Sequence, residues 1–492
     1  MFMRLGRFMQ SRRLGLAVLG LVACVWSGIG QWAVGQDQPA SQQRMTGTID
    51  PAQLGIVLPS KGPIEPGAGR RVVTVDEAGR PVVAKLHLRA EDGLCVVMLP
   101  SGRLVSMPGS KTIPTERPFK PMDGAELVGR LKNGPLEEFQ TATGSHYLYL
   151  YKCNDSFYQA THDILESLHE GVIEQLTKWG LPVEPPSVPL VALIFPDRAS
   201  FDAFHQMPAG VLAYYSAVNN LIVLYEDPEL SDAAPELALK QAAYTIAHEG
   251  VHQILFNVGV QQRLSSWPAW LSEGVPELFC PVRVTSSMAK DGTDSMPRRS
   301  IRWSRVGMVN DLRMFDLLRM KPESGSLIEK TVAAERLGSD GYAIAWGLVH
   351  YLNDSQPKQF QSYLREIAAT PALNSLGPEN DKALQALFAK YWGADFKRIE
   401  SGVTRHLNSK SVKDNYRDPL VYQTYYLVVH TALRGKTAKV TAMVTTSPDG
   451  ARQWRAEEQK KKDPSLKHGF RAIVCETRQK AEAELGRIGP KR

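Results

Sequence analysis

The amino-acid sequence predicts an α+β protein of several domains. Short β-rich runs separated by turn-forming residues dominate residues 70–140, whereas long helical patterns mixed with a few strands fill residues 141–408. At 492 residues the chain is also too long for one ordinary hydrophobic core. We therefore expect a small antiparallel β-domain at 70–140, a larger α+β domain at 141–408, and a C-terminal extension with a basic tail at 409–492.

Residues 1–35 have the layout of a signal peptide for export. Four arginines precede an uncharged apolar run from Leu14 to Val34, and Ala33 and Gly35 are small residues that suit cleavage before the next residue. Two alternatives remain, a lipid anchor at Cys24 and an uncleaved membrane anchor, because the run is about long enough to span a bilayer. The expected location is periplasmic or extracellular.

The segment that follows the signal, residues 36–69, is rich in Gln, Pro, Gly and Ser and has little apolar periodicity. This composition predicts a flexible leader, with ordered structure starting near Arg71. The β-domain is predicted from four β-rich runs with turn residues between them, at 72–75, 82–84, 95–98 and 104–107.

The larger domain is predicted to begin with an alternating strand and to become helical in its second half. Its expected strands are 146–151, 189–195 and 221–225. Its expected helices are 156–179, 199–205 and 235–258, followed by a helical region from Met314 to about His406.

The net charge of +7 is unevenly distributed along the chain. Four positive charges belong to the signal, and the residues from Ala451 onward contain twelve Lys and Arg against six Asp and Glu, so the body between them is mildly acidic. This distribution argues against a nucleic-acid groove and is compatible with contact between the basic tail and anionic polymers of the cell envelope.

Four cysteines follow the signal, Cys95, Cys153, Cys280 and Cys475, and none forms a CxxC pair. A zinc site made of cysteines is therefore not expected. An exported protein permits disulfides, so the four residues form either two bridges or buried free thiols.

The segment from His248 to His252 carries the chemistry that the sequence indicates most clearly. Two histidines four residues apart on the helix 235–258 project from one face, so both can bind the same zinc ion. Glu249 lies beside them and can accept a proton from a water that zinc activates. One zinc ion is the expected cofactor.

A third ligand is expected in the segment 267–277, where Trp-Leu-Ser-Glu-Gly places Glu273 twenty-one residues after His252. With the HExxH motif, this arrangement resembles the gluzincin metallopeptidases, the thermolysin-like clan. More narrowly, it is similar to a family of uncharacterised secreted bacterial proteins with a peptidase-MA-like core. The resemblance covers about residues 144–406. It implies that Glu273 ligates zinc and that Glu277 orients one histidine ligand. Pro276 departs from the pattern and predicts a kink between these two glutamates.

The segment 341–352 resembles the helix that carries a catalytic tyrosine in this clan, which makes Tyr342 the candidate for stabilising the oxyanion. A packed core aromatic is the alternative for Tyr342, Tyr214 and Tyr215 are weaker candidates, and His350 is either a core histidine or functional. The strand containing Leu221, Ile222 and Val223 resembles the edge strand that binds extended substrate.

The resemblance implies a gluzincin-like fold and an exported zinc metallopeptidase acting on a protein or peptide. No motif that would hold a free substrate N-terminus is visible, which favours an endopeptidase. Two alternatives share the same residues: a non-catalytic scaffold protein of the envelope that retains the fold and the zinc, and a hydrolase of a non-peptide amide such as a cell-wall crosslink.

Overall fold

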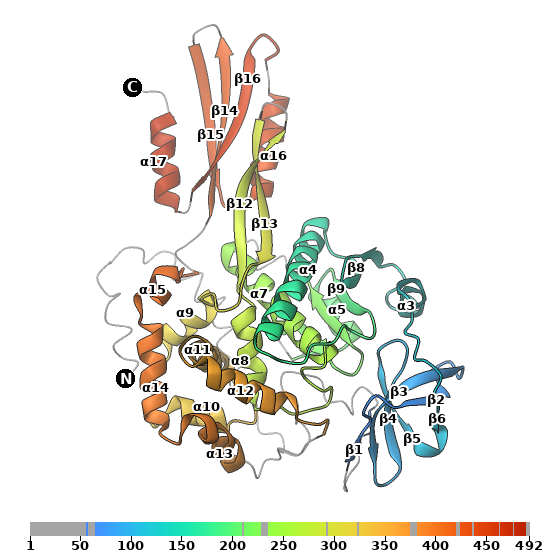
Figure 1. Ribbon diagram of the computed structural model, residues 1–492. Coiled ribbons are helices and arrows are strands. Elements are labelled where there is room, and N and C mark those ends of the chain that lie inside the picture. Colours follow the sequence, from blue (N-terminus) through green and yellow to red (C-terminus); the bar gives the residue numbers. More distant parts are fainter. Residues whose placement is uncertain are drawn as a thin grey trace.

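The chain folds as an α+β protein with four separate sheets in its described part (Figure 1). The computed structural model describes residues 56–57, 64–208, 211–227, 235–291, 294–321, 324–373, 381–419, 424–434, 437–461, 463–475 and 477–488. The predicted signal and most of the predicted leader lie outside these residues.

The N-terminal β-domain is a six-stranded antiparallel sheet with the strand order β5-β4-β3-β2-β6, in which β1 also pairs with β3. All four predicted runs form strands. The domain begins earlier than expected, because β1 lies within the segment predicted as a flexible leader and its Ile64 pairs with Ala90. The strands are β1 Ile64–Pro66, β2 Arg71–Val75, β3 Pro81–Ala90, β4 Leu94–Met98, β5 Leu104–Pro108 and β6 Ile113–Pro114.

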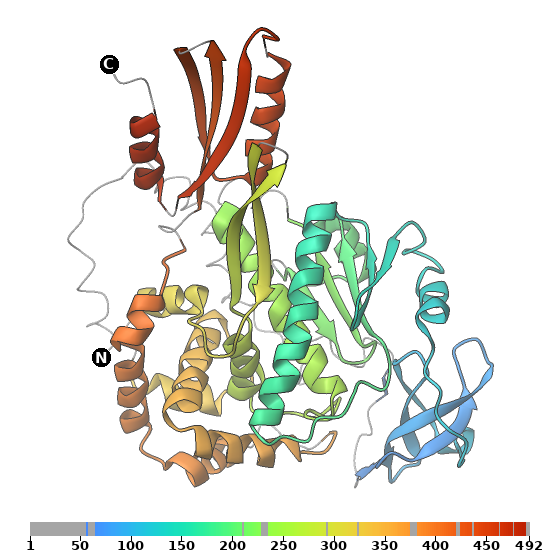
Figure 2. The same cartoon turned by 45° about the horizontal axis from the view of Figure 1, so that its top comes forward.

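The central sheet has the order β10-β11-β9-β8-β7, with parallel strands in the middle and an antiparallel strand at each edge. Helices cover both faces, α4 and α7 on one and α3 and α5 on the other (Figures 1 and 2). The inner strands are continuous apolar runs because both of their faces are buried. The elements are α3 Gly124–Leu131, β7 Gln140–Thr143, β8 Tyr147–Tyr151, α4 Asp155–Lys178, β9 Leu190–Phe195, α5 Arg198–Phe204, β10 Ala213–Ser216, β11 Leu221–Tyr225 and α7 Pro235–Asn257.

One sequence prediction is wrong in this sheet. The strand with Leu221, Ile222 and Val223, predicted as an edge strand, is β11 and lies between β9 and β10. Both of its backbone edges are paired, so it cannot accept an added strand. The edge strand next to β11 is β10, and β7 forms the opposite edge.

The second half of the domain is helical, as predicted, and packs around α11. Helices α8 and α11 approach closely at Gly274, where a Cβ atom would lie 2.6 Å from Val349 Cγ2 and 2.9 Å from the carbonyl oxygen of Ala345. The helices are α8 Ala269–Phe279, α9 Asp311–Arg319, α10 Leu327–Ala333, α11 Ser339–Ser355, α12 Pro357–Ala368, α13 Asp381–Trp392, α14 Phe396–Leu407 and α15 Lys410–Asn415.

The C-terminal residues, for which the sequence predicted an extension with a basic tail, form a small folded domain. Three antiparallel strands in the order β15-β14-β16 pack with two helices, and a long hairpin from the central domain, β12–β13, lies beside β16 and α16 (Figures 1 and 2). The apolar run at residues 427–429 of the C-terminal domain lies within β14, the central strand of this sheet. The elements are β12 Val282–Asp291, β13 Asp294–Trp303, β14 Tyr425–Arg434, β15 Thr437–Thr445, α16 Pro448–Lys460, β16 Lys467–Cys475 and α17 Arg478–Ile488.

Two further observations bear on the sequence predictions. Cys95, Cys153, Cys280 and Cys475 are all buried free thiols, so the alternative of two disulfides is wrong. Within the ranges that the structure covers, no helix combines the length and the apolar character needed to cross a bilayer.

Candidate metal centre

Helix α7 places the two motif histidines on the face that meets α8. The opposite face of α7 packs very closely against α4 at Gly250, the middle residue of the motif. A Cβ atom at this position would lie 2.7 Å and 2.8 Å from the Cδ2 atoms of Leu168 and Leu165. Glycine therefore lets α7 sit tightly on α4, which fixes the helix behind the histidine side chains.

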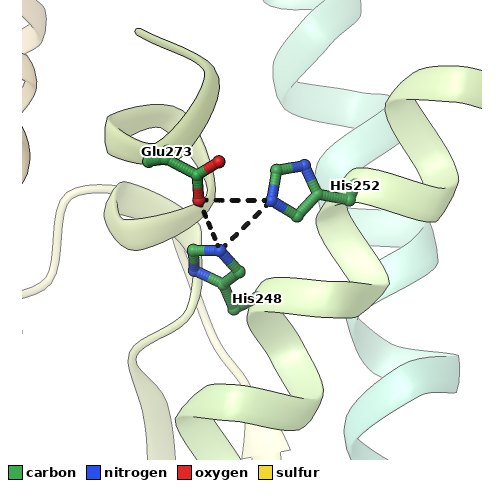
Figure 3. A group of neighbouring side chains, drawn as sticks. All are labelled: His248, His252 and Glu273. Atoms are coloured by element: carbon green, nitrogen blue, oxygen red, sulfur yellow. Dashed lines mark hydrogen bonds and ion pairs between the residues drawn. The ribbon is translucent and has the colours of Figure 1, made fainter. Parts of the chain in front are cut away.

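His248, His252 and Glu273 converge on one point between α7 and α8, as Figure 3 shows. The His248 Nε2 atom lies 3.1 Å from His252 Nε2 and 3.2 Å from Glu273 Oε2, and His252 Nε2 lies 3.6 Å from the same oxygen. All three residues are buried. The sequence prediction that these three side chains share one site is thus confirmed as to position.

The triangle has the dimensions that a metal ion requires. Zinc with nitrogen and oxygen ligands at about 2.0–2.1 Å in tetrahedral geometry separates its ligand atoms by about 3.3 Å, close to the separations found here. In addition, Glu273 Oε1 is buried and has no hydrogen-bond partner in the part of the chain that the structure describes. Two imidazole nitrogens and a carboxylate oxygen suit zinc, so the residues fit the predicted ion.

Glu277 holds His248 from the opposite side. Its Oε1 atom lies 3.3 Å from His248 Nδ1 and accepts a hydrogen bond of 2.7 Å from Arg313 Nη2, while its Oε2 atom accepts one of 2.7 Å from Asn310 Nδ2. With Nδ1 protonated toward Glu277, the Nε2 lone pair of His248 points at the metal position. Helix α8 continues through Pro276, so the expected kink does not carry Glu277 away from the histidine.

The charges of the centre favour a cation. Burial opposes ionisation of His248, yet Glu273 and Glu277 raise the pKa of this imidazole to about 10. Burial likewise opposes ionisation of Glu273, but its bonds to the two histidines lower its pKa to about 2. The same two carboxylates would also favour a metal cation bound at the Nε2 atom of His248.

Glu249 lies next to the triangle and is held by the edge strand of the central sheet. Its Oε2 atom accepts a hydrogen bond of 2.8 Å from the backbone N–H of Tyr215 on β10. Burial raises the pKa of Glu249, and the nearby histidines partly offset this rise. A carboxylate with a raised pKa beside a metal position is suited to accepting a proton.

Tyr342 also borders the centre. Its ring centroid lies 6.2 Å from that of His248 and 5.3 Å from the guanidinium carbon of Arg313. Burial, followed by the charges of Glu273 and Glu249, raises the pKa of Tyr342 well above its usual value. The phenol therefore stays protonated and keeps a hydrogen to donate.

The other candidates lie elsewhere. His350 contacts His406 and the carbonyl oxygen of Gly307, and it is not among the three converging residues. The Tyr215 hydroxyl donates to Asn220, so only its backbone reaches the centre, and Tyr214 packs in the cluster on the other face of the sheet.

Two contributors escaped the sequence prediction, Arg313 and Asn310. They lie more than thirty residues after Glu277 and reach its carboxylate because α8 and α9 both pack against α11. The sequence offered one local indication, which was that Asn310 suits the N-cap of a helix. Its side chain accepts a hydrogen bond from the backbone N–H of Arg313 at the start of α9.

Comparison with known families identifies a segment but no activity. Residues 242–374 match a family described as "Protein of unknown function (DUF1570)". This segment, about a quarter of the chain, contains the three converging residues together with Glu249, Glu277, Arg313 and Tyr342. No curated protein matches the chain.

Proposed function

We propose that the protein is an exported zinc-dependent peptidase of the gluzincin type that cleaves within polypeptides. One observation carries the proposal: the Nε2 atoms of His248 and His252 and the Oε2 atom of Glu273 face one another at 3.1–3.6 Å, with the carboxylate of Glu249 beside them. The signal layout of residues 1–35 supports export.

In the proposed mechanism His248, His252 and Glu273 hold one zinc ion, which when bound lowers the pKa of water and polarises the substrate carbonyl. Glu249 accepts the proton of the attacking water and delivers it to the leaving amine. Tyr342 donates a hydrogen bond to the oxyanion that forms from the carbonyl oxygen. Glu277 keeps His248 in the tautomer that presents its Nε2 lone pair.

The edge strand β10 is the place where an extended substrate would bind. Because the Tyr215 N–H points to Glu249 and away from β11, the open edge of β10 borders the catalytic residues. No strand in the described ranges pairs with that edge. A peptide added there would make backbone contacts that depend little on its side chains, as expected of an endopeptidase with broad specificity.

The test is the substitution Glu249→Gln. It keeps all three proposed ligands, so the variant should bind one equivalent of zinc while kcat/KM on a peptide library falls by about 100-fold or more. Glu174→Gln, an exposed change on α4, is the matched control and should retain full activity.

Two other outcomes would reject the proposal. Equal activity of the Glu249→Gln variant would exclude Glu249 as the base. One equivalent of zinc without turnover of any peptide in the wild-type protein would favour the scaffold, or the hydrolase of a non-peptide amide if cell-wall fragments are cleaved.

A further inference from the structure

A second concave site lies apart from the metal centre, where the base of the β12–β13 hairpin meets α7, α9, α11 and α15. It is a pocket of about 490 Å³, within the range of small-molecule sites. None of the three converging metal-centre residues lines it. Its floor includes Lys240 and Tyr244, which precede His248 on α7 by two turns and one turn, roughly 12 Å and 6 Å along the helix.

The pocket carries an excess of positive charge. Four cationic side chains line it, those of Lys240, Arg283, Arg305 and Arg417, against the two carboxylates of Asp311 and Asp354. Lys240 and Asp311 neutralise each other in an ion pair of 2.6 Å. The surplus therefore resides on the arginines.

Two of these arginines have no counter-ion among the described residues. Arg283 and Arg305 are exposed at the pocket wall and make no hydrogen bond or ion pair within the described chain. Arg283 also stands directly opposite Arg302 in the β12–β13 register, and Arg302 is equally unpaired among the described residues. Like charges directly opposite across two strands destabilise a hairpin, and a bound anion would relieve this repulsion.

The histidines at the other side of the pocket add no charge at neutral pH. Burial lowers the pKa of His350 to about 4 and also lowers the pKa of His406. His350 Nδ1 and His406 Nε2 lie 2.7 Å apart, and His350 Nε2 donates to the carbonyl oxygen of Gly307 at 3.2 Å. These bonds make a rigid uncharged wall.

The remaining walls are apolar or carry hydroxyl groups. The apolar side chains in the lining are Val282, Val284, Met308, Val309 and Val412. The uncharged polar ones are Ser409, Ser411, Asn415 and Thr424. A ligand that fills this space needs an apolar body and an acidic group, because guanidinium groups bind carboxylates and phosphates in a planar, bidentate manner.

We propose that this pocket binds a small organic anion, with its carboxylate or phosphate on Arg283 and Arg305 and its apolar part against the valines. The site is distinct from the metal centre, and the proposal does not depend on the proposed peptidase activity. Because carboxylates and phosphates share the chemistry that arginine recognises, separate probes must distinguish them.

The experiment measures binding of phenylacetate and phenyl phosphate to the purified full-length protein by calorimetry and thermal shift at constant ionic strength. 2-Phenylethanol is the uncharged analogue. We expect one of the two acids to bind and to raise Tm, and the analogue to bind at least about tenfold more weakly. Whichever acid binds identifies the acidic group that the pocket accepts.

Arg283→Gln and Arg305→Gln should each weaken that binding about tenfold or more, and Arg305→Lys, which keeps the charge but loses the planar fork, should weaken it less. Arg398→Gln, an exposed change on α14 outside the pocket, is the matched control and should bind as the wild type. The Tm of each variant without ligand verifies folding.

Three results would overturn the proposal. They are no binding of either acid at up to about 10 mM, equal binding of 2-phenylethanol, and unchanged affinity in both arginine variants. The last result would place the acid elsewhere, for example on the metal.

Discussion

Glu277 is the residue through which the metal centre is connected to the rest of the fold. It receives bonds from Arg313 on α9 and from Asn310, which precedes that helix, and it contacts His248 on α7. A buried carboxylate with these partners stays ionised, and Arg313 together with His248 keeps the pKa of Glu277 well below its usual range despite the opposing effect of burial. The orientation of His248 thus depends on residues from two other parts of the chain.

We predict that Glu277→Gln weakens zinc binding about 10- to 100-fold while the protein stays folded, because the amide is similar in shape but cannot stabilise the Nδ1–H tautomer as a charge does. Zinc affinity is measured by competition with a chromophoric chelator. Glu400→Gln is the matched control, since Glu400 is also buried and accepts from Ser326 and Leu327, which are not metal-centre residues. Equal zinc affinity of wild type and Glu277→Gln would show that Glu277 does not position His248.

Individual site residues could be predicted from the sequence where their role follows from local spacing alone. His248, Glu249 and His252 are predictable because a helical spacing of four residues alone places both imidazoles on one face. The assignment of Glu273 as the third ligand depended on the resemblance to the gluzincin metallopeptidases. The roles of Arg313 and of the Tyr215 backbone N–H could not be predicted from the sequence, because only tertiary packing brings them to Glu277 and Glu249.

The pair of helices α8 and α11 determines how firmly Glu273 is held. Glu273 is adjacent to Gly274, whose missing side chain lets α8 lie directly against the backbone of α11. A residue with a Cβ atom at position 274 must push these helices apart, because one neighbouring atom is a backbone carbonyl oxygen that cannot rotate away.

We predict that Gly274→Ala lowers the free energy of unfolding by about 1–3 kcal/mol and shifts Glu273 enough to weaken zinc binding. Gly129→Ala on α3 is the opposite control. It has no heavy atom within 4 Å of the added Cβ, so the gain in helix propensity should stabilise the protein by about 0.5–1 kcal/mol. Urea unfolding of both variants compares them, and a Gly274→Ala protein as stable as the wild type would contradict the close contact.

The elements that sequence reasoning found are those with a strong local period. The apolar stripe of α7 and the buried strands β8 and β9 were predicted nearly to their ends. The hairpin β12–β13 was not predicted, because its sequence is mostly polar and alternates only over short stretches at its base, 282–285 and 301–303. It is a hairpin that packs against the C-terminal domain, a contact that no local pattern can reveal.

At the scale of the whole molecule, the β-domain contacts the central domain at the loop between α7 and α8. The Arg263 guanidinium donates to the carbonyl oxygen of Gly102 at 2.5 Å, and His87 Nε2 lies 2.6 Å from the carbonyl oxygen of Arg263. A small apolar cluster that includes Leu104, Val218 and Leu264 closes the interface. The two domains therefore share a specific interface, which the sequence, read as separate segments, did not indicate.

This interface should respond to acid through His87. Burial lowers the pKa of His87 to about 4, from about 6.5 in the unfolded chain. The unfolded state therefore binds the proton first as the pH falls. Stability from the neutral imidazole is fully present above about pH 6.5 and is progressively lost down to about pH 4.

We predict that replacing His87 by Gln, which can still donate to the carbonyl of Arg263 but does not titrate, reduces the loss of unfolding free energy between pH 7 and pH 5 by up to about 2 kcal/mol. Urea unfolding at both pH values measures the difference, and the metal-centre histidines cancel because they are common to both proteins. His205→Gln, at the end of α5, is the control for the loss of one imidazole outside this interface. An unchanged pH dependence in His87→Gln would mean that the docked β-domain does not hold this histidine neutral.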